Sequence, residues 1–356
     1  MPGVYISYPF CAQKCTYCNF ASGVLPRELE SKYVSALRAE LRKTEWRWTP
    51  ETVYLGGGTP SQMESGELAT LLAEVPGREW SEATMEAAPG TITPEKAAFW
   101  RAAGINRVSL GVQSFVQDEL AKTGRKHTAE VVEREVAWLR EAGISSINID
   151  LIAGLPGQTE ASWNQSLEWI QRLEAPHVSV YMLEVDEDSR LGRELLILGQ
   201  RYGAAEVPDE DRVASFYETA VERLAQMGVP RYEISNFARP GFESRHNLKY
   251  WRREPYLGFG ADAHSFDGAS RWQNPEAAAD YVENSSLHDF TPADLVSERF
   301  FLGLRLSEGI EGPMTPFEKV IERFTADGLL EKTGERVRLT PRGVLLSNEV
   351  FAEFLG

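Results

Sequence analysis

The chain has 356 residues, of which 42% are hydrophobic and 25% are charged, and these proportions exclude a disordered chain, a fibrous repeat and a small disulfide scaffold. Its 37 Lys and Arg against 53 Asp and Glu give a net charge of −16, which disfavours an extended nucleic-acid surface. The sequence shows neither an apolar run of membrane-spanning length nor a basic segment leading into a signal core. We therefore expect a cytoplasmic protein that is not stably inserted in a membrane.

The N-terminal half alternates strand-like with helix-like segments. Apolar runs predict six strands, at residues 4–10, 52–55, 84–88, 107–111, 146–152 and 177–183. Helical periodicity lies between them, at residues 27–46, 64–73, 94–103, 128–142 and 162–173. Strands joined by crossover helices form a parallel sheet. The pattern predicts an α/β fold, which is either a partial barrel or a doubly wound sheet.

This alternation ends near residue 186. We expect a helix over 209–227 and a strand over 231–234, which close a core domain of residues 1–235. A loop-rich, aromatic connecting region is expected over 236–290. Residues 291–356 read as two helices, a hairpin that pairs 328–330 with 337–339, and a last helix. This last segment resembles a small winged-helix-like α+β module.

Cysteine is confined to one place in the chain. Cys11, Cys15 and Cys18 follow the first predicted strand with the spacing C-x3-C-x2-C. Three thiolates this close can ligate one metal centre, and in a [4Fe-4S] cluster they leave one iron without a protein ligand. The alternative is a zinc site completed by a distant His, although neither His127 nor His246 has a local spacing relation to the cysteines.

The other predicted strands are associated with glycines or polar residues. The second strand runs into Gly56-Gly57-Gly58-Thr59-Pro60-Ser61, which is either a tight turn or a place where the backbone approaches a ligand. Polar residues lie in or at the ends of later strands: Glu86, Ser109, Gln113, Asn148, Asp150 and Tyr181. Each alone could be a capped turn or a hydrogen-bonded core group. Together they predict one pocket at the carboxyl ends of the strands.

These motifs together resemble those of a known family. Tyr5-Ile-Ser-Tyr-Pro-Phe10 before the cysteines, the loop 56–61, Gly111-Val-Gln-Ser-Phe115 and residues 150–159 resemble the radical S-adenosylmethionine (SAM) superfamily. Within it the chain is similar to the group of oxygen-independent coproporphyrinogen III oxidases and their heme-chaperone relatives (HemW-like). The resemblance covers nearly the whole chain. It implies a partial (β/α)6 barrel in which Cys11, Cys15 and Cys18 hold a [4Fe-4S] cluster whose open iron binds SAM.

The resemblance also implies which residues bind the cofactor. Tyr5 and Tyr17 would lie near the cluster, and Gly57, Gly58 and Thr59 would hold the methionyl part of SAM. The positions that would contact its methionyl and ribose groups are Glu86, Gln113, Arg125 and Asp150. A guanidinium such as that of Arg125 can pair with a carboxylate in a fork. Without the family pattern, Arg125 would be read as an exposed basic residue.

Two features bear on the subgroup, and one further position departs from the family pattern. The oxidases carry a fourth cysteine two residues after the third, where this chain has Phe20. The segment His246-Asn-Leu-Lys-Tyr250-Trp251 matches the HNxxYW motif of the heme chaperones, which implies His246 as a heme ligand beside an aromatic surface. Without that pattern, His246 would be read as a packed or hydrogen-bonded histidine. Ser7 stands where family members usually have His, which puts any role of that imidazole in doubt.

Three functions follow as hypotheses. The first is a heme chaperone that binds the cluster, SAM and heme, and transfers heme to an acceptor protein. The second is a coproporphyrinogen oxidase that decarboxylates propionates with a 5′-deoxyadenosyl radical, and the third is a radical SAM enzyme with another substrate. The expected partners are a heme or related tetrapyrrole, a heme-acceptor protein and an electron donor for the cluster.

Overall fold

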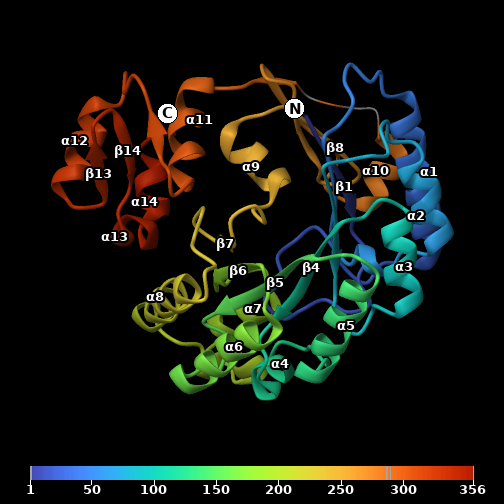
Figure 1. Ribbon diagram of the computed structural model, residues 1–356, viewed down its shortest axis with the longest axis horizontal. Coiled ribbons are helices and arrows are strands. Elements are labelled where there is room, and N and C mark those ends of the chain that lie inside the picture. The colour runs from blue at the N-terminus through green and yellow to red at the C-terminus, as the bar shows by residue number, and fades with distance from the viewer. Residues whose placement is uncertain (1, 286–287, 289, 356) are drawn as a thin grey trace.

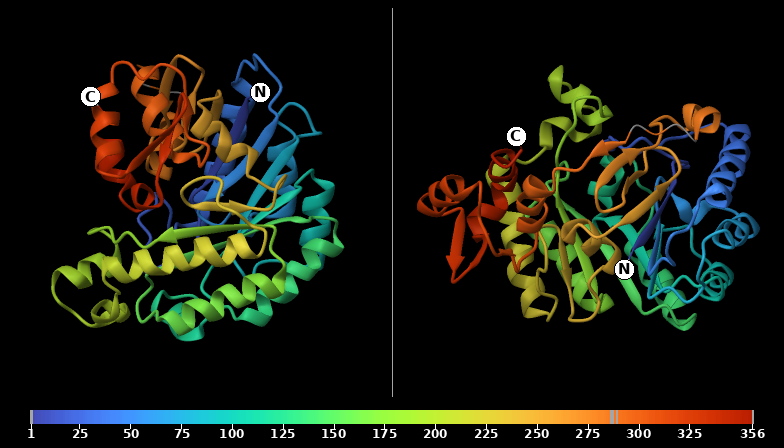
Figure 2. Two further views of the ribbon diagram at one scale, coloured as in Figure 1. Left: turned by 60° about the vertical axis from the view of Figure 1, so that its left-hand side comes forward. Right: turned by 90° about the horizontal axis from the view of Figure 1, so that it is seen from above.

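The computed structural model describes residues 2–285, 288 and 290–355. Most of its strands belong to one sheet, in the order β11-β10-β9-β8-β1-β2-β3-β4-β5-β6-β7. Its first six strands are β1 (Gly3–Tyr8), β2 (Thr52–Gly57), β3 (Glu82–Ala87), β4 (Arg107–Gln113), β5 (Ser146–Ala153) and β6 (His177–Met182). These six are parallel and adjacent in chain order. The sheet curves without pairing its two edges, which confirms the predicted partial barrel (Figure 2).

Helices connect the parallel strands and cover the outside of the sheet (Figure 1). They are α1 (Arg27–Lys43), α2 (Ser65–Leu72), α3 (Pro94–Ala102), α4 (Gln117–Lys122), α5 (Ala129–Glu141) and α6 (Glu160–Leu173). Helix α6 shows why such segments are helical. Thr159 and Ser162 form a reciprocal capping box at its start, and one face buries Trp163, Leu167 and Ile170.

The two faces of the sheet differ in polarity. Residues that face the helices are apolar and buried, such as Val53, Met85 and Leu110. The alternate residues face the barrel interior, where Glu86 pairs in register with Ser109, and Ser109 pairs with Asn148. The strand register therefore gathers the polar strand residues inside the barrel.

After β6 the alternation of strands and helices ends near the predicted position. Helices α7 (Arg190–Leu196) and α8 (Glu210–Gln226) follow, and the 3-10 helix Arg201–Glu206 lies between them. The strand predicted over 231–234 is wrong, because Arg231 and Glu233 form only isolated bridges. The chain turns there, as the Asn236 amide donates to the Glu233 carbonyl, and the strand forms afterwards as β7 (Asn236–Ala238), antiparallel to β6.

The region 236–290 contributes to the sheet rather than only connecting two parts. It contains α9 (Arg245–Arg252), β8 (Tyr256–Phe259), β9 (His264–Phe266), β10 (Ser270–Gln273) and α10 (Ala278–Asn284). Strand β8 pairs in parallel with β1, and β9, β10 and β11 (Thr291–Pro292) extend that edge with antiparallel pairs. These strands have two to four residues, too few for a clear alternation in the sequence.

The C-terminal segment forms a small α+β module at one side of the barrel, next to α9 (Figure 1). Its elements are α11 (Leu295–Phe301), the 3-10 helix Gly303–Arg305, β12 (Ile310–Glu311), α12 (Glu318–Ala326), β13 (Leu330–Thr333), β14 (Arg336–Leu339), α13 (Pro341–Leu345) and α14 (Ser347–Ala352). The predicted hairpin is confirmed as β13 and β14, which β12 extends to three strands. The expected last helix is split into α13 and α14. In the part of the chain that the structure describes, no helix is long and apolar enough to cross a membrane.

Candidate cofactor site

The largest group of expected site residues lines one cavity of about 510 Å³ at the carboxyl ends of the parallel strands. The predicted site residues that line this cavity are Cys11, Cys15, Tyr17, Cys18, Gly57, Gly58, Thr59, Glu86, Gln113, Arg125 and Asp150. These residues come from strands β2 to β5, from the loops after β1 and β2, and from the segment after α4. Ligands of parallel α/β folds bind at this end. Tyr5 and His246 lie outside this cavity.

The cysteine loop leaves β1 and is fixed at several points. The Cys11 amide donates to the Gly23 carbonyl at 2.9 Å, and the Thr16 amide donates to the Thr123 carbonyl. The Leu191 amide of α7 donates to the Thr16 carbonyl at 2.8 Å. All three cysteines are free and partly exposed, and burial raises the pKa of the Cys18 thiol. Within the described residues, no three His, Cys, Asp or Glu side chains already form a metal-ion site.

The glycine loop lies against the cysteine loop. The Gly58 amide donates to the Tyr8 carbonyl at 2.8 Å, and the Thr59 amide donates to the Phe10 carbonyl at 2.9 Å. Gly57 has a φ of +106°, which side-chain-bearing residues rarely adopt. A Cβ on Gly58 would lie 2.7 Å from the Phe10 carbonyl oxygen. Glycine is therefore required here for the two loops to approach each other.

Two of the carboxyl groups that line the cavity, those of Glu86 and Asp150, lie on strands of the barrel. Glu86 accepts hydrogen bonds from the Tyr54 hydroxyl at 2.8 Å and from the Gly57 amide at 3.1 Å. Burial raises its pKa to about 7, and the nearby Asp150 adds to the rise. Asp150 accepts from Asn148 at 2.7 Å and from Ser109 at 3.2 Å, and burial raises its pKa as well. The polar strand residues thus orient the two acids.

Arg125 is one of three cationic residues that line the cavity, together with Lys14 and Lys126. Its guanidinium donates to the Gly111 carbonyl at 2.6 Å, while its buried Nε has no hydrogen-bond partner. Burial opposes its charge, but Tyr17, Cys15 and Asp150 together keep its pKa above the ordinary value. Buried polar atoms are normally paired, so the free Nε indicates a ligand with an acceptor group.

The neighbouring His127 was not among the predicted site residues. It lines the cavity, and its Nε2 is buried without a hydrogen-bond partner. Burial and the charge of Arg125 lower its pKa to about 4, so the imidazole is neutral at pH 7. Its position two residues after Arg125 was the available signal in the sequence.

Gln113 marks the end of β4. It has a φ of +72°, and the register between β4 and β5 shifts between Leu110 and Gln113. A non-glycine residue in this region is strained, and such strain concentrates at ligand sites. The shifted backbone places Gln113 on the cavity wall.

Tyr5 lies on the wall of a second cavity, of about 550 Å³, together with Tyr250, Trp251, Tyr256 and His264. Tyr5 also lies close to a residue that lines the first cavity, Glu86. A Cβ on Gly56 would lie 3.0 Å from the Tyr5 ring and 3.0 Å from the Glu86 carboxylate. Tyr5 therefore lies between the two cavities, and its expected contact with SAM stays a prediction.

His246 occupies a core position. It is 0% exposed, its Nδ1 lies 2.8 Å from the Thr52 hydroxyl, and its Nε2 lies 2.8 Å from the Tyr250 hydroxyl. Burial lowers the pKa of the imidazole to about 3. Both ring nitrogens are thus engaged, so ligation of heme iron by His246 would require the ring to leave this arrangement. That role stays a prediction, and in this conformation the packed, hydrogen-bonded alternative describes the residue.

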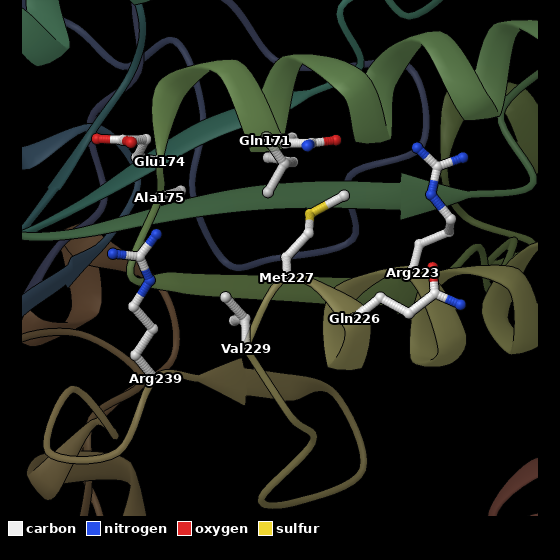
Figure 3. Close-up of a pocket in the computed structure, with 9 residues that line it drawn as sticks. Gln171, Glu174, Ala175, Arg223, Gln226, Met227, Val229 and Arg239 are labelled. Carbon is white, nitrogen blue, oxygen red and sulfur yellow. The ribbon is translucent and has the colours of Figure 1, made fainter.

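A third hollow, of about 550 Å³, lies on the outside between α6 and α8 (Figure 3). Its wall includes Glu174, Arg223 and Arg239, whose side chains extend from separate segments. None of the predicted site residues lines it. This hollow is therefore separate from the predicted site.

The barrel with a cysteine loop at its carboxyl end defines the class of protein. The family model of the Radical SAM superfamily matches residues 5–170, and that of the HemN C-terminal domain matches residues 290–346. The structure is similar to that of coproporphyrinogen III oxidase (HemN) from Escherichia coli, with a TM-score of 0.83 at 21% identity, covering 99% of this chain and 90% of that one. At this identity the likeness shows the fold.

Relatives at higher identity define the family. The chain is 33% identical to the heme chaperone HemW of Bacillus subtilis over 100% of both chains. It is 36% identical to that of Mycobacterium tuberculosis, covering 99% of this chain and 95% of the relative. It is 31% identical to that of Escherichia coli, covering 99% and 97%. The chain belongs to the HemW family of radical SAM proteins.

Proposed function

We propose that this protein is a heme chaperone that binds a [4Fe-4S] cluster, SAM and heme, and delivers heme to an acceptor protein. The observation that carries the proposal is the combination of the cysteine-lined cavity with full-length similarity to proteins named heme chaperone HemW. A cytoplasmic location, an electron donor for the cluster and a heme-acceptor protein are parts of the same proposal.

The cavity fits a cluster with SAM. Cys11, Cys15 and Cys18 would hold three irons, and the open iron would supply redox chemistry and a binding point for SAM. The unpaired Nε of Arg125 fits a carboxylate, and the close approach at Gly57 and Gly58 fits a small ligand lying against the backbone. Soft thiolates also bind zinc, so metal analysis belongs to the test.

The residues around the cavity can position a ligand. Tyr54 and Gly57 orient the Glu86 carboxyl group. In this position the carboxyl group can accept a hydrogen bond from an amino or hydroxyl group of a ligand. Asn148 and Ser109 orient Asp150 in the same way. Gln113, on the strained end of β4, supplies an amide that can both donate and accept.

A second candidate function is oxidative decarboxylation of coproporphyrinogen III, because the fold matches that of HemN. Phe20 argues against it. This residue takes the place of the extra cysteine of the oxidases, lines the cysteine cavity and is 68% exposed. A phenyl ring has no ligating or redox-active atom for that position.

One set of assays separates the two functions. Anaerobically reconstituted protein is titrated with hemin, and a parallel sample is incubated with coproporphyrinogen III, SAM and dithionite. We expect saturable hemin binding and no protoporphyrinogen. Formation of protoporphyrinogen, or absence of hemin binding, would overturn the proposal. A variant with all three cysteines changed to alanine shows which of the two signals depends on the cluster.

A further inference from the structure

We propose that heme binds in the second cavity, between α9, β8, β9 and α11, with His264 as the ligand of its iron. This inference rests on the proposed function and adds a binding site and an iron ligand to it.

The volume and composition of this cavity suit a porphyrin. Its volume of about 550 Å³ lies within the range of small-molecule sites. The aromatic and aliphatic part of the wall includes Tyr250 and Trp251 of α9, Tyr256 of β8, and Phe301 and Leu302 at the end of α11. A porphyrin is flat and apolar, so aromatic and aliphatic side chains can cover its faces.

His264 supplies the iron ligand. It is the first residue of β9, its side chain is exposed, and it lines this cavity. In the described part of the chain, no hydrogen bond engages its imidazole, whereas both ring nitrogens of His246 are engaged. A neutral imidazole with a free nitrogen is the usual protein ligand of heme iron.

The charged groups Arg271, Glu298 and Asp262 of the cavity already have hydrogen-bond partners. Arg271 donates to both carboxylate oxygens of Glu298, at 2.5 and 2.8 Å, and also to the Tyr256 hydroxyl at 3.0 Å. Asp262 accepts from Gln273 at 2.6 Å. The Arg271 guanidinium is therefore not available to pair with a heme propionate. We place the propionates at the solvent side of the cavity, where His264 is exposed.

The two cavities lie close to each other. Tyr5 lines the second cavity, which we call the aromatic cavity. Across Gly56, Tyr5 approaches Glu86, which lines the cavity that contains the cysteines. The Tyr250 hydroxyl also reaches the buried His246 at 2.8 Å. Heme in this cavity would therefore lie close to the SAM site. His246 would hold Tyr250, a wall residue of the heme cavity, in place through the hydrogen bond to its hydroxyl.

Titration with hemin and with metal-free protoporphyrin IX tests the site in the full-length, cluster-reconstituted protein. We expect His264→Ala to weaken hemin binding at least tenfold and to remove the absorption bands of histidine-ligated ferric heme, with metal-free protoporphyrin binding unchanged. His264→Met should bind hemin with shifted bands. Leu302→Arg, which places a charge on the apolar wall, should weaken the binding of both compounds. His288→Ala is the matched control and should behave as the wild type.

The outcomes separate this inference from the proposed function. If the wild type binds hemin and His264→Ala binds it with the same affinity and bands, the ligand assignment is overturned and the chaperone proposal stands. If the wild type binds no hemin, both are overturned. Urea unfolding of each variant shows whether a loss of binding reflects a loss of folding.

Discussion

The carboxyl groups of Glu86 and Glu40 show how burial makes single residues sensitive to pH. Glu40 of α1 accepts hydrogen bonds from Tyr281, Asn274 and the Gly260 amide, and burial raises the pKa of both acids to about 7. The folded protein thus keeps these protons at pH values where the unfolded chain has lost them. The stability that these two groups contribute is therefore fully present below the ordinary pKa of 4.5. It is lost as the pH rises through about 7.

We expect Glu86→Gln and Glu40→Gln each to reduce this loss of stability between about pH 5 and about pH 8. Urea unfolding of the cluster-free protein at the two pH values measures it. Glu168→Gln on the exposed face of α6 is the control and should leave the pH dependence unchanged. An unaltered slope in both test variants would refute the burial argument.

His246 gives a second prediction at the residue scale. Removing its ring leaves the Thr52 and Tyr250 hydroxyls without their partner in the core. We expect His246→Ala to lower the free energy of unfolding by roughly 1–3 kcal/mol, as measured in urea. His264→Ala, on the surface, should change it by less than about 0.5 kcal/mol. Equal stability of wild type and His246→Ala would contradict the structural role.

The sequence predicted single site residues well where they follow a motif. The cysteines, Gly57, Gly58 and Asp150 lie in contiguous family motifs, and the structure brings them to one cavity. His127 and His264 were missed because their importance depends on burial and on contacts between distant segments. A packed, hydrogen-bonded His246 was one of the two alternatives from the sequence, but its partner Thr52 could not be identified, since it is 194 positions away in the chain.

At the scale of elements, the contact between the glycine loop and the cysteine loop gives a third prediction. Gly57→Ala would strain a backbone with φ of +106°, and Gly58→Ala would push the loop off Phe10. We expect each to weaken SAM binding at least tenfold, equivalent to about 1.4 kcal/mol or more, in isothermal titration of the reconstituted protein.

Gly241→Ala separates strain from contact. Gly241 has a φ of +89°, but a Cβ there would meet no atom within 4 Å. This variant should lose some stability and keep its affinity for SAM. If Gly241→Ala weakens SAM binding as much as Gly58→Ala does, the loss would come from general destabilisation rather than from the loop.

Elements were predictable according to their length. The helices between the parallel strands have clear periodicity, and the predicted ranges agree with α1, α5 and α6 within a few residues. The short strands β8, β9 and β10 were missed because their formation depends on pairing with β1 and with each other. The strand at 231–234 was misplaced because a local hydrogen bond from the Asn236 side chain to the Glu233 carboxylate forms a turn there, and Glu233 forms a bridge with the distant Leu306.

At the scale of the whole molecule, the C-terminal module is attached to the barrel by specific contacts. The Ser307 amide donates to the Tyr232 carbonyl at 2.9 Å, and the guanidinium of Arg305 lies 4.3 Å from the ring of Trp251. Arg305 also faces the fully buried Glu233 at 4.0 Å. The module therefore supports the wall of the aromatic cavity.

We expect Arg305→Met to lower the free energy of unfolding by roughly 1–3 kcal/mol, because it leaves the Glu233 carboxylate with less compensation and removes the contact with Trp251. Urea unfolding followed by tryptophan fluorescence measures this. Arg323→Met, whose exposed partner is Glu353, is the control and should have little effect. Identical transitions for both variants would contradict the attachment described here.

The central claim is that three neighbouring thiolates hold an iron–sulfur cluster with one iron open to SAM. The most direct measurement is the EPR spectrum of the anaerobically reconstituted, dithionite-reduced protein with and without SAM. The account predicts about four irons per chain and a spectrum whose g values shift when SAM is added, with the shift reduced in Gly58→Ala. Zinc in place of iron, or a cluster whose spectrum does not change with SAM, would contradict it.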